Sequence, residues 1–185
     1  MPVLWVVLGI IVVVVLAGVF AYNRFVSQKQ LIKDAWANID TELRRRYDLI
    51  PNIVETVKGY ASHEREVLEN VTQARAMATG AGGSPAAQAA AEGPLVAALR
   101  QLFAVVENYP DLKANQNFLA LQEELIGTES KIAYARQFYN DQVMRSNTLI
   151  QSFPSSIIAR AFGFQERPFF EIEEGTRGPV QVELS

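Results

Sequence analysis

The side chains that could do acid–base chemistry in this chain begin with its single histidine, His63. It lies in the run 62–66 (SHERE), where a neighbouring glutamate could orient the imidazole ring as a general base. Catalysis would also need a nucleophile, a metal or a second titrating group at a defined spacing, and the sequence supplies no unmistakable one. We therefore expect a solvent-facing or helix-capping histidine, and we predict no catalytic residue.

Metal and cofactor chemistry is limited by composition. The chain has no cysteine, which excludes disulfide frameworks, thiol nucleophiles and zinc clusters of the Cys/His type. A dinuclear carboxylate bundle needs the Glu-x-x-His motif twice, and only one histidine exists. The glycine-rich motifs that bind nucleotide phosphates are also missing from the sequence. We predict neither a metal site nor a cofactor.

Two polar stripes at helical spacing are better candidates for interhelical contacts. The later stripe recurs at steps of seven, seven, four and seven residues and consists of Gln122, Glu129, Arg136, Asn140 and Asn147. The earlier stripe has similar spacing and consists of Asn38, Arg45, Asp48 and Asn52.

We predict that these stripes face each other as an interhelical polar ladder, which would set the register of the helices. The predicted members are Asp48, Asn52, Glu129, Arg136, Asn140 and Asn147. In this hypothesis Arg136 reaches an acidic partner such as Asp48. The alternative is that both stripes are ordinary solvated helix flanks.

Three consecutive arginines occupy residues 44–46. Successive helical residues are rotated by about 100°, so the three side chains cannot form one flat patch. They also lie about 30 Å beyond the apolar N-terminal segment on a straight helix, whereas attraction to anionic headgroups is screened within about 8 Å. We expect a solvated, ion-paired helix face here and, with a net charge of -3, no nucleic-acid partner. Lys29 and Lys33 are better placed to contact lipid.

The first element that must position these residues is an apolar run. Residues 1–23 contain no Lys, Arg, Asp, Glu or His, and residues 3–22 are long enough to cross a bilayer as a helix. Trp5 and Tyr22 lie near its two ends, where aromatic rings favour the headgroup region. We predict an uncleaved transmembrane anchor that contacts membrane lipid. A cleavable signal peptide is the rival interpretation, but the run is long and no basic residue precedes it.

The orientation of the anchor follows from its flanks. Basic residues are absent before it, whereas Arg24, Lys29 and Lys33 follow it closely. The positive-inside rule therefore predicts that the C-terminal domain lies in the cytoplasm.

The rest of the chain has helical periodicity, and no window shows sustained alternation of the β type. We predict one helix over 25–78, continuous with the anchor and kinked at Pro51. A mobile Gly/Ala-rich connection is expected over 79–94. The later elements are expected to be helices over 95–108, 115–152 and 157–162, followed by an extended tail.

These elements predict an all-α protein in which a single N-terminal transmembrane helix continues into an antiparallel bundle of three to four long helices. The expected division is an anchor (1–23), a helical bundle (24–164) and a C-terminal tail (165–185). Within the tail, the motif Phe169-Phe170-Glu171 is expected to dock back on the bundle; the alternative is a partner-binding segment.

Several motifs occur in order within residues 35–64, 121–143, 146–154 and 161–171. Together they resemble the LemA family of bacterial membrane proteins, and the resemblance covers roughly residues 22–171. One departure is Ser146, where the family usually has tyrosine. The resemblance implies a single-pass anchor in the bacterial inner membrane, a helical cytoplasmic domain and little established biochemistry. Some relatives are associated with organelle biogenesis in magnetosome-forming bacteria.

We expect a non-enzymatic, membrane-anchored scaffold that acts through protein–protein contacts. The protein partners are not identified by the sequence and could include a second copy of the chain. Two alternatives remain open: a homo-oligomer that organises or remodels membrane, and an uncharacterised enzyme that uses carboxylates and His63.

Overall fold

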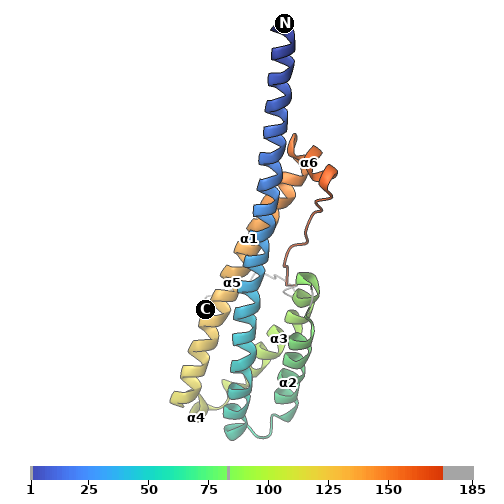
Figure 1. Cartoon of the computed structure of the whole chain (residues 1–185). Helices are drawn as coiled ribbons and strands as arrows, with labels where there is room; N and C mark the ends of the chain where they lie inside the picture. Colours follow the sequence, from blue (N-terminus) through green and yellow to red (C-terminus); the bar gives the residue numbers. More distant parts are fainter. Residues whose placement is uncertain (1, 83, 173–185) are drawn as a thin grey trace, which may run out of the picture. The chain divides into compact units, whose positions relative to one another are not determined.

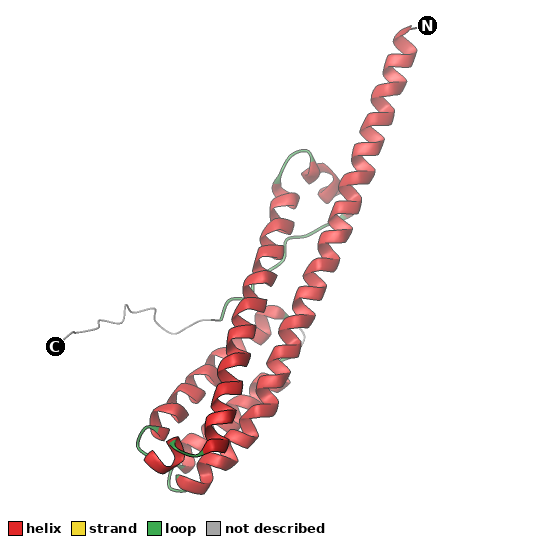
Figure 2. Ribbon diagram, turned by 90° about the vertical axis from the view of Figure 1, so that its left-hand side faces the viewer, coloured by secondary structure: helices red, strands yellow, loops and turns green. Residues whose placement is uncertain are grey.

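A computed structural model describes residues 2–82 and 84–172, and within these residues all regular structure is helical (Figures 1 and 2). The helices are α1 (Pro2–Tyr60), α2 (Arg65–Gly80), α3 (Pro85–Val106), α4 (Pro110–Lys113), α5 (Gln116–Gln151) and α6 (Ser155–Phe162). The predicted all-α class, with a long apolar helix at the N-terminus, is confirmed.

Helix α1 joins the apolar N-terminal run to the following segment without a break. It extends over 59 residues and passes through Pro51. The prediction that this helix continues to residue 78 is wrong, because α1 ends at Tyr60 and a turn over 61–64 precedes α2. The apolar stripe conceals this break: Val57 is buried before it, Ala61 within it and Leu68 after it, at spacings that one helix would also give.

The connection predicted over 79–94 is also wrong in its extent. Helix α2 ends at Gly80, and α3 already begins at Pro85 and contains Pro94. Ser84 is the N-cap, and its hydroxyl oxygen accepts a hydrogen bond from the backbone N–H of Ala87 at 3.2 Å. Proline in the first turn and the alanines that follow favour helix. Only residues 81–84 connect the two helices.

The described chain forms two compact units. The first contains α1 up to Asp40 and the stretch Ala133–Phe169, which includes the second half of α5 and α6. Its core consists of apolar side chains from these segments: Phe25, Ile32, Ala35, Ile39, Ala135, Tyr139, Val143 and Ala159. The rings of Trp36 and Tyr139 meet edge to face at 5.9 Å.

The second unit contains, among the described residues, Thr41–Ile132 and the stretch 170–172. Its core draws on α1, α2, α3, α4 and α5, and includes Leu43, Ile50, Ile53, Val57, Val71, Leu95, Leu102, Leu112, Phe118 and Leu125. Phe170 is fully buried, whereas its neighbour Phe169 is exposed. This burial supports docking of the Phe-Phe-Glu motif. Residues 173–185 of the expected tail lie outside the described residues, and the expected division into anchor, bundle and tail stays a prediction.

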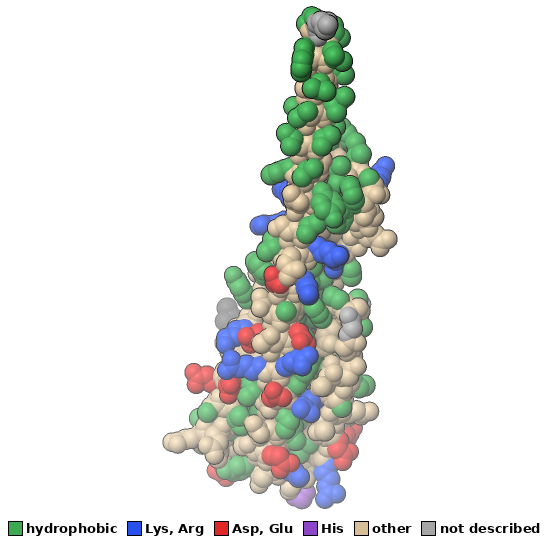
Figure 3. All heavy atoms as spheres, in the orientation of Figure 1, with side chains coloured by type: hydrophobic (Ala, Val, Ile, Leu, Met, Phe, Trp, Pro, Cys, Tyr) green, Lys and Arg blue, Asp and Glu red, His purple; other side chains and the backbone are tan. Residues whose placement is uncertain are grey.

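The N-terminal part of α1 exposes large apolar side chains at nearly every position from Val3 to Phe20, and Figure 3 shows them on one face. Among the described helices, α1 and α3 are long and apolar enough to cross a membrane. The most apolar 18-residue stretch of α1 is not buried, whereas that of α3 is 39% buried. Helix α3 also contributes Leu95 and Leu102 to the core of the second unit. The N-terminus of α1 is therefore the candidate membrane helix, and α3 is a core helix.

Candidate functional site

The strongest polar site lies inside the second unit and is built around Arg46. Its side chain is 0% exposed and forms an ion pair with Glu92 of α3, which is also 0% exposed. Arg46 Nη1 additionally donates to Glu129 of α5, at 2.9 Å to Oε1 and 3.2 Å to Oε2. Arginine is almost never fully buried unless it is paired, and here two carboxylates neutralise it.

Two uncharged side chains form hydrogen bonds with Oε1 of Glu92. The Tyr47 hydroxyl donates to Glu92 Oε1. Gln88 Nε2 lies 2.8 Å from the same oxygen, 2.8 Å from the Tyr47 hydroxyl and 3.0 Å from the carbonyl oxygen of Ala78. We call Arg46, Tyr47, Gln88, Glu92 and Glu129 the Arg46 cluster. Its members and the Ala78 carbonyl bring together α1, α2, α3 and α5.

The Arg46 cluster has the properties of a structural contact between helices and lacks those of a catalytic centre. Arg46 and Glu92 are fully buried, and Gln88 and Tyr47 are nearly so, so a substrate could reach only the Glu129 edge. Each buried polar group must be matched by a partner on another helix, and this requirement fixes the helical register. Within residues 2–82 and 84–172, no group of three or more His, Asp or Glu side chains is placed to hold a metal ion.

The prediction of a solvated helix face is therefore wrong for Arg46, which is buried, and correct for its neighbours Arg44 and Arg45. Arg44 and Arg45 are exposed, and Arg45 Nη2 pairs with Glu124 Oε1 at 3.0 Å on the surface. Two neighbouring arginines in this run thus pair with glutamates in different environments: the side chain of Arg46 is buried and that of Arg45 is exposed.

The residues of the predicted polar ladder are distributed over both units. Glu129 belongs to the Arg46 cluster. Asp48 and Asn52 are exposed on α1 in the second unit, and Arg136 and Asn140 are half-buried on α5 in the first unit. The pairing of Arg136 with Asp48 stays a prediction.

Asn147, the last ladder residue, binds the segment that follows α6. Its Nδ2 donates to the carbonyl oxygen of Arg167 at 3.0 Å, and its Oδ1 accepts from the Arg167 backbone N–H at 2.9 Å. This reciprocal pair gives the non-helical backbone at Arg167 a partner on α5. A side chain predicted to set helix register therefore also holds the chain after α6.

The sequence analysis did not predict a buried pair of glutamines in the first unit. Gln28 Nε2 lies 3.0 Å from both the carbonyl oxygen and the Oε1 of Gln142, and both side chains are buried. The position of Gln28 in the helix indicates its burial, because it lies on the same helix face as the buried Phe25, Ile32 and Ala35. Gln88 and Glu92 were missed because they lie in the stretch interpreted as a connection.

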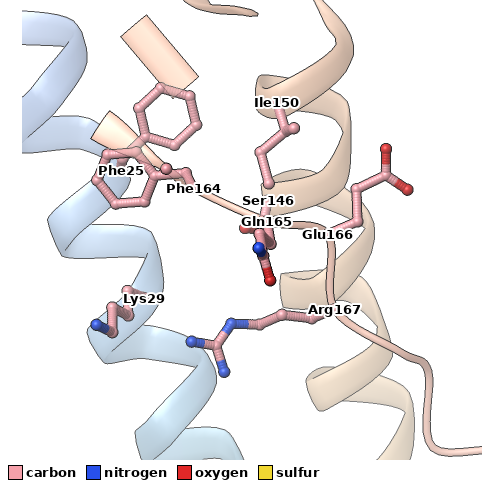
Figure 4. Close-up of a pocket in the computed structure, with 9 residues that line it drawn as sticks. Phe25, Lys29, Ser146, Ile150, Phe164, Gln165, Glu166 and Arg167 are labelled. Atoms are coloured by element: carbon pink, nitrogen blue, oxygen red, sulfur yellow. The ribbon is translucent and has the colours of Figure 1, made fainter. Parts of the chain in front are cut away.

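A polar cavity of about 290 Å³ also lies in the first unit (Figure 4). Phe25 and Phe164 stack above it with ring centroids 4.7 Å apart, and the side chains of Lys29 and Arg167 extend along its lower side. Ser146, the position at which the sequence departs from the usual tyrosine, also lines it. Lys29 and Arg167 thus bring positive charge to the cavity from two segments that are distant in the sequence, and the carboxylate of Glu166 also lines it.

His63 lies exposed in the turn between α1 and α2, as expected for a solvent-facing histidine. Beside it, the Tyr109 hydroxyl donates to Glu64 Oε1 at 3.0 Å. This hydrogen bond to Glu64 raises the pKa of Tyr109 above its usual value. In the first unit, burial raises the pKa of Tyr139, while the charge of Arg167 acts to lower it.

Comparison with known proteins identifies the relatives of this chain. Magnetosome protein MamQ 2 of Paramagnetospirillum magneticum is 24% identical over 184 residues, which cover 86% of this chain and 68% of the relative. Protein LemA of Metamycoplasma hominis is 22% identical over 160 residues, with coverages of 86% and 73%. The family model described as the LemA family matches residues 35–184. The chain therefore belongs to the LemA family.

Proposed function

We propose that this protein is a membrane-anchored helical scaffold that acts through protein–protein contacts in the cytoplasm of a bacterial cell. The anchor is the N-terminal run of α1, whose apolar side chains are exposed from Val3 to Phe20. Such a surface is unfavourable in water and suits the hydrocarbon core of a bilayer. The basic residues that follow it, Arg24, Lys29 and Lys33, support a cytoplasmic location for the rest of the chain.

The observation that carries the scaffold proposal is an exposed aromatic pair on α5. Tyr134 is 74% exposed and Phe138 is 40% exposed, and the two lie one helical turn apart in the first unit. Aromatic residues are enriched at the cores of protein interfaces, where they supply much of the binding energy. This pair provides an apolar contact surface for a protein partner. The helix that carries it, α5, is held in place by its own buried side chains.

Cross-linking tests the proposal. Full-length wild type and the Tyr134→Ser/Phe138→Ser variant are cross-linked in cells, and adducts in the membrane fraction are identified by mass spectrometry. We expect the variant to lose the main adducts. Leu119→Ser, which changes another exposed apolar residue of α5, is the matched control and should keep them. The same adducts with both variants would contradict the proposal.

The mass of the adducts also distinguishes the kind of partner. A second copy of this chain would indicate self-association, and would favour the role of a homo-oligomer that organises membrane. A different protein would indicate a scaffold for that protein.

The enzyme alternative has weaker support. Arg46 and Glu92 are buried, and His63 stands exposed in a turn. If the protein acts without catalysis, His63→Ala should complement a deletion strain as well as the wild type does. Loss of complementation by a normally expressed His63→Ala protein would favour an enzyme instead.

The orientation is tested separately. Because the chain has no cysteine, a Ser62→Cys variant carries one thiol in the α1–α2 turn. We expect a membrane-impermeant maleimide to label it only after the cells are opened. Labelling of intact spheroplasts would place this turn outside the cytoplasm.

A further inference from the structure

An apolar groove of about 720 Å³ lies in the first unit, between α1 and the turn that joins α5 to α6. Leu149 and Ile157 line it from α5 and α6. Its lining on α1 includes three small residues, Ala17, Gly18 and Ala21, among larger ones. The small side chains leave room for a channel beside the helix.

Helix α6 lies close to α1 beside this groove. A Cβ atom on Gly18 would lie 3.8 Å from Ile158 Cδ1, and the ring of Phe162 lies 4.8 Å from that of Tyr22. Gly18 and Tyr22 both belong to the uncharged run of α1, about one helical turn apart. Helix α6 therefore packs against the end of the segment that is proposed to cross the membrane (Figure 1).

The free surface of α6 is also apolar. Ile157 and Phe162 of α6 are exposed, as is Phe153 in the turn before it, and Arg160 is the only charged residue of the helix. A short helix with exposed large apolar side chains and a flanking arginine is typical of a segment that lies in the membrane interface. The arginine can extend its charged group towards water or phosphate while its aliphatic part stays in the apolar layer.

We propose that α6 is an interfacial membrane helix and that the groove beside it holds one acyl chain of a membrane phospholipid. This inference rests on the proposed function, because it requires the apolar run of α1 to cross the bilayer. Lipid is the expected occupant because the groove is continuous with the exposed apolar surface at Val14 and Phe20. Arg24, the first charged residue after the run, lines the groove and provides the positive charge that a lipid phosphate needs.

Spin-label depth measurements test the position of α6. Full-length single-cysteine variants Val12→Cys, Ile157→Cys and Ser62→Cys are labelled in vesicles of phosphatidylcholine and phosphatidylglycerol. Labels at positions 12 and 157 should be relaxed by oxygen and protected from a water-soluble nickel chelate, and position 62 should show the reverse. A water-exposed label at 157 with a protected label at 12 would overturn the position of α6 alone. Exposure of both would overturn the anchor itself.

Photo-cross-linking tests the occupant. A phospholipid with a diazirine on its acyl chain should form adducts with groove residues of the wild type in vesicles. Ala17→Phe and Ser152→Phe fill the groove from opposite walls, and each should lower the adduct yield at least threefold. Val12→Phe, on the anchor but outside the groove lining, is the matched control and should not.

The headgroup is tested with the same probe. Arg24→Gln should lower the yield when the probe carries a phosphatidylglycerol headgroup, because the substitution removes the charge that faces the phosphate. Unchanged yields in both filled variants, or cross-linked dimers in place of lipid adducts, would overturn the proposal. Unfolding temperatures equal to that of the wild type confirm that the variants remain folded.

Discussion

Replacing Arg46 by methionine should strongly destabilise the second unit. The substitution keeps an unbranched side chain of similar length but leaves Glu92, which is 0% exposed, without its cation. Removing one partner of a buried ion pair costs about 3–5 kcal/mol. At about 2–4 °C per kcal/mol for a chain of this size, the unfolding temperature should fall by about 6–20 °C. Circular dichroism of the full-length protein in detergent measures this change.

The neighbouring residue supplies the matched control. Arg45 pairs with Glu124 at 3.0 Å, but the two side chains are 47% and 43% exposed. Exposed pairs contribute about 0–1 kcal/mol, so Arg45→Met should lower the unfolding temperature by no more than about 4 °C. The two variants change the same residue type, one position apart on the same helix, and differ in burial.

A second substitution shows whether the buried charge is the cause. In Arg46→Met/Glu92→Gln the carboxylate is replaced by an uncharged amide, whose oxygen can still accept from Tyr47 and Gln88. We expect this double variant to recover at least half of the lost stability. Equal stability of Arg46→Met and Arg45→Met, or a double variant less stable than Arg46→Met alone, would refute the reasoning.

Three further predictions concern other contacts. Phe170→Ala should cost about 3–5 kcal/mol of unfolding free energy because the ring is fully buried, and a chemical denaturation curve measures it. Asn147→Ala should speed hydrogen exchange at the amide of Arg167, which would lose its acceptor; unchanged exchange would contradict the contact. The raised pKa of Tyr109 means that its bond to Glu64 stabilises the fold below pH 10, and that this stabilisation is lost as pH rises further. The stability advantage of wild type over Tyr109→Phe should therefore shrink above pH 10, and an advantage independent of pH would argue against it.

The sequence predicted the elements that carry a strong apolar signal. The uncharged N-terminal run, its continuation into one helix and the bounds of α5 all follow from residues whose spacing repeats over many turns. The turn over 61–64 was missed because a four-residue interruption preserved the apparent phase of the stripe. Helix α3 was missed at its start because its buried positions there are Gln88, Ala89 and Glu92, which carry almost no hydropathy signal.

That second error explains why the Arg46 cluster was not predicted. Glu92, the carboxylate that pairs with Arg46, lies in the stretch interpreted as a mobile connection, so no buried partner was available for an arginine on α1. Glu129 was recognised as part of a polar stripe, but its partner Arg46 was assigned to the solvent. A pair joined across 83 residues of sequence leaves no periodic pattern in a single chain.

The division of the described chain has a consequence for the order in which it folds during synthesis. The second unit draws on Thr41–Ile132, so nearly all of it has been translated before the first unit is complete; only the chain from Phe170 arrives later. The first unit forms between segments that are far apart in the sequence. Gln28 and Gln142, for example, are hydrogen-bonded and lie 114 residues apart. Domains generally fold as their residues emerge from the ribosome. The unit that contains the candidate membrane helix thus begins to be translated first, but its core can form only after most of the second unit has been made.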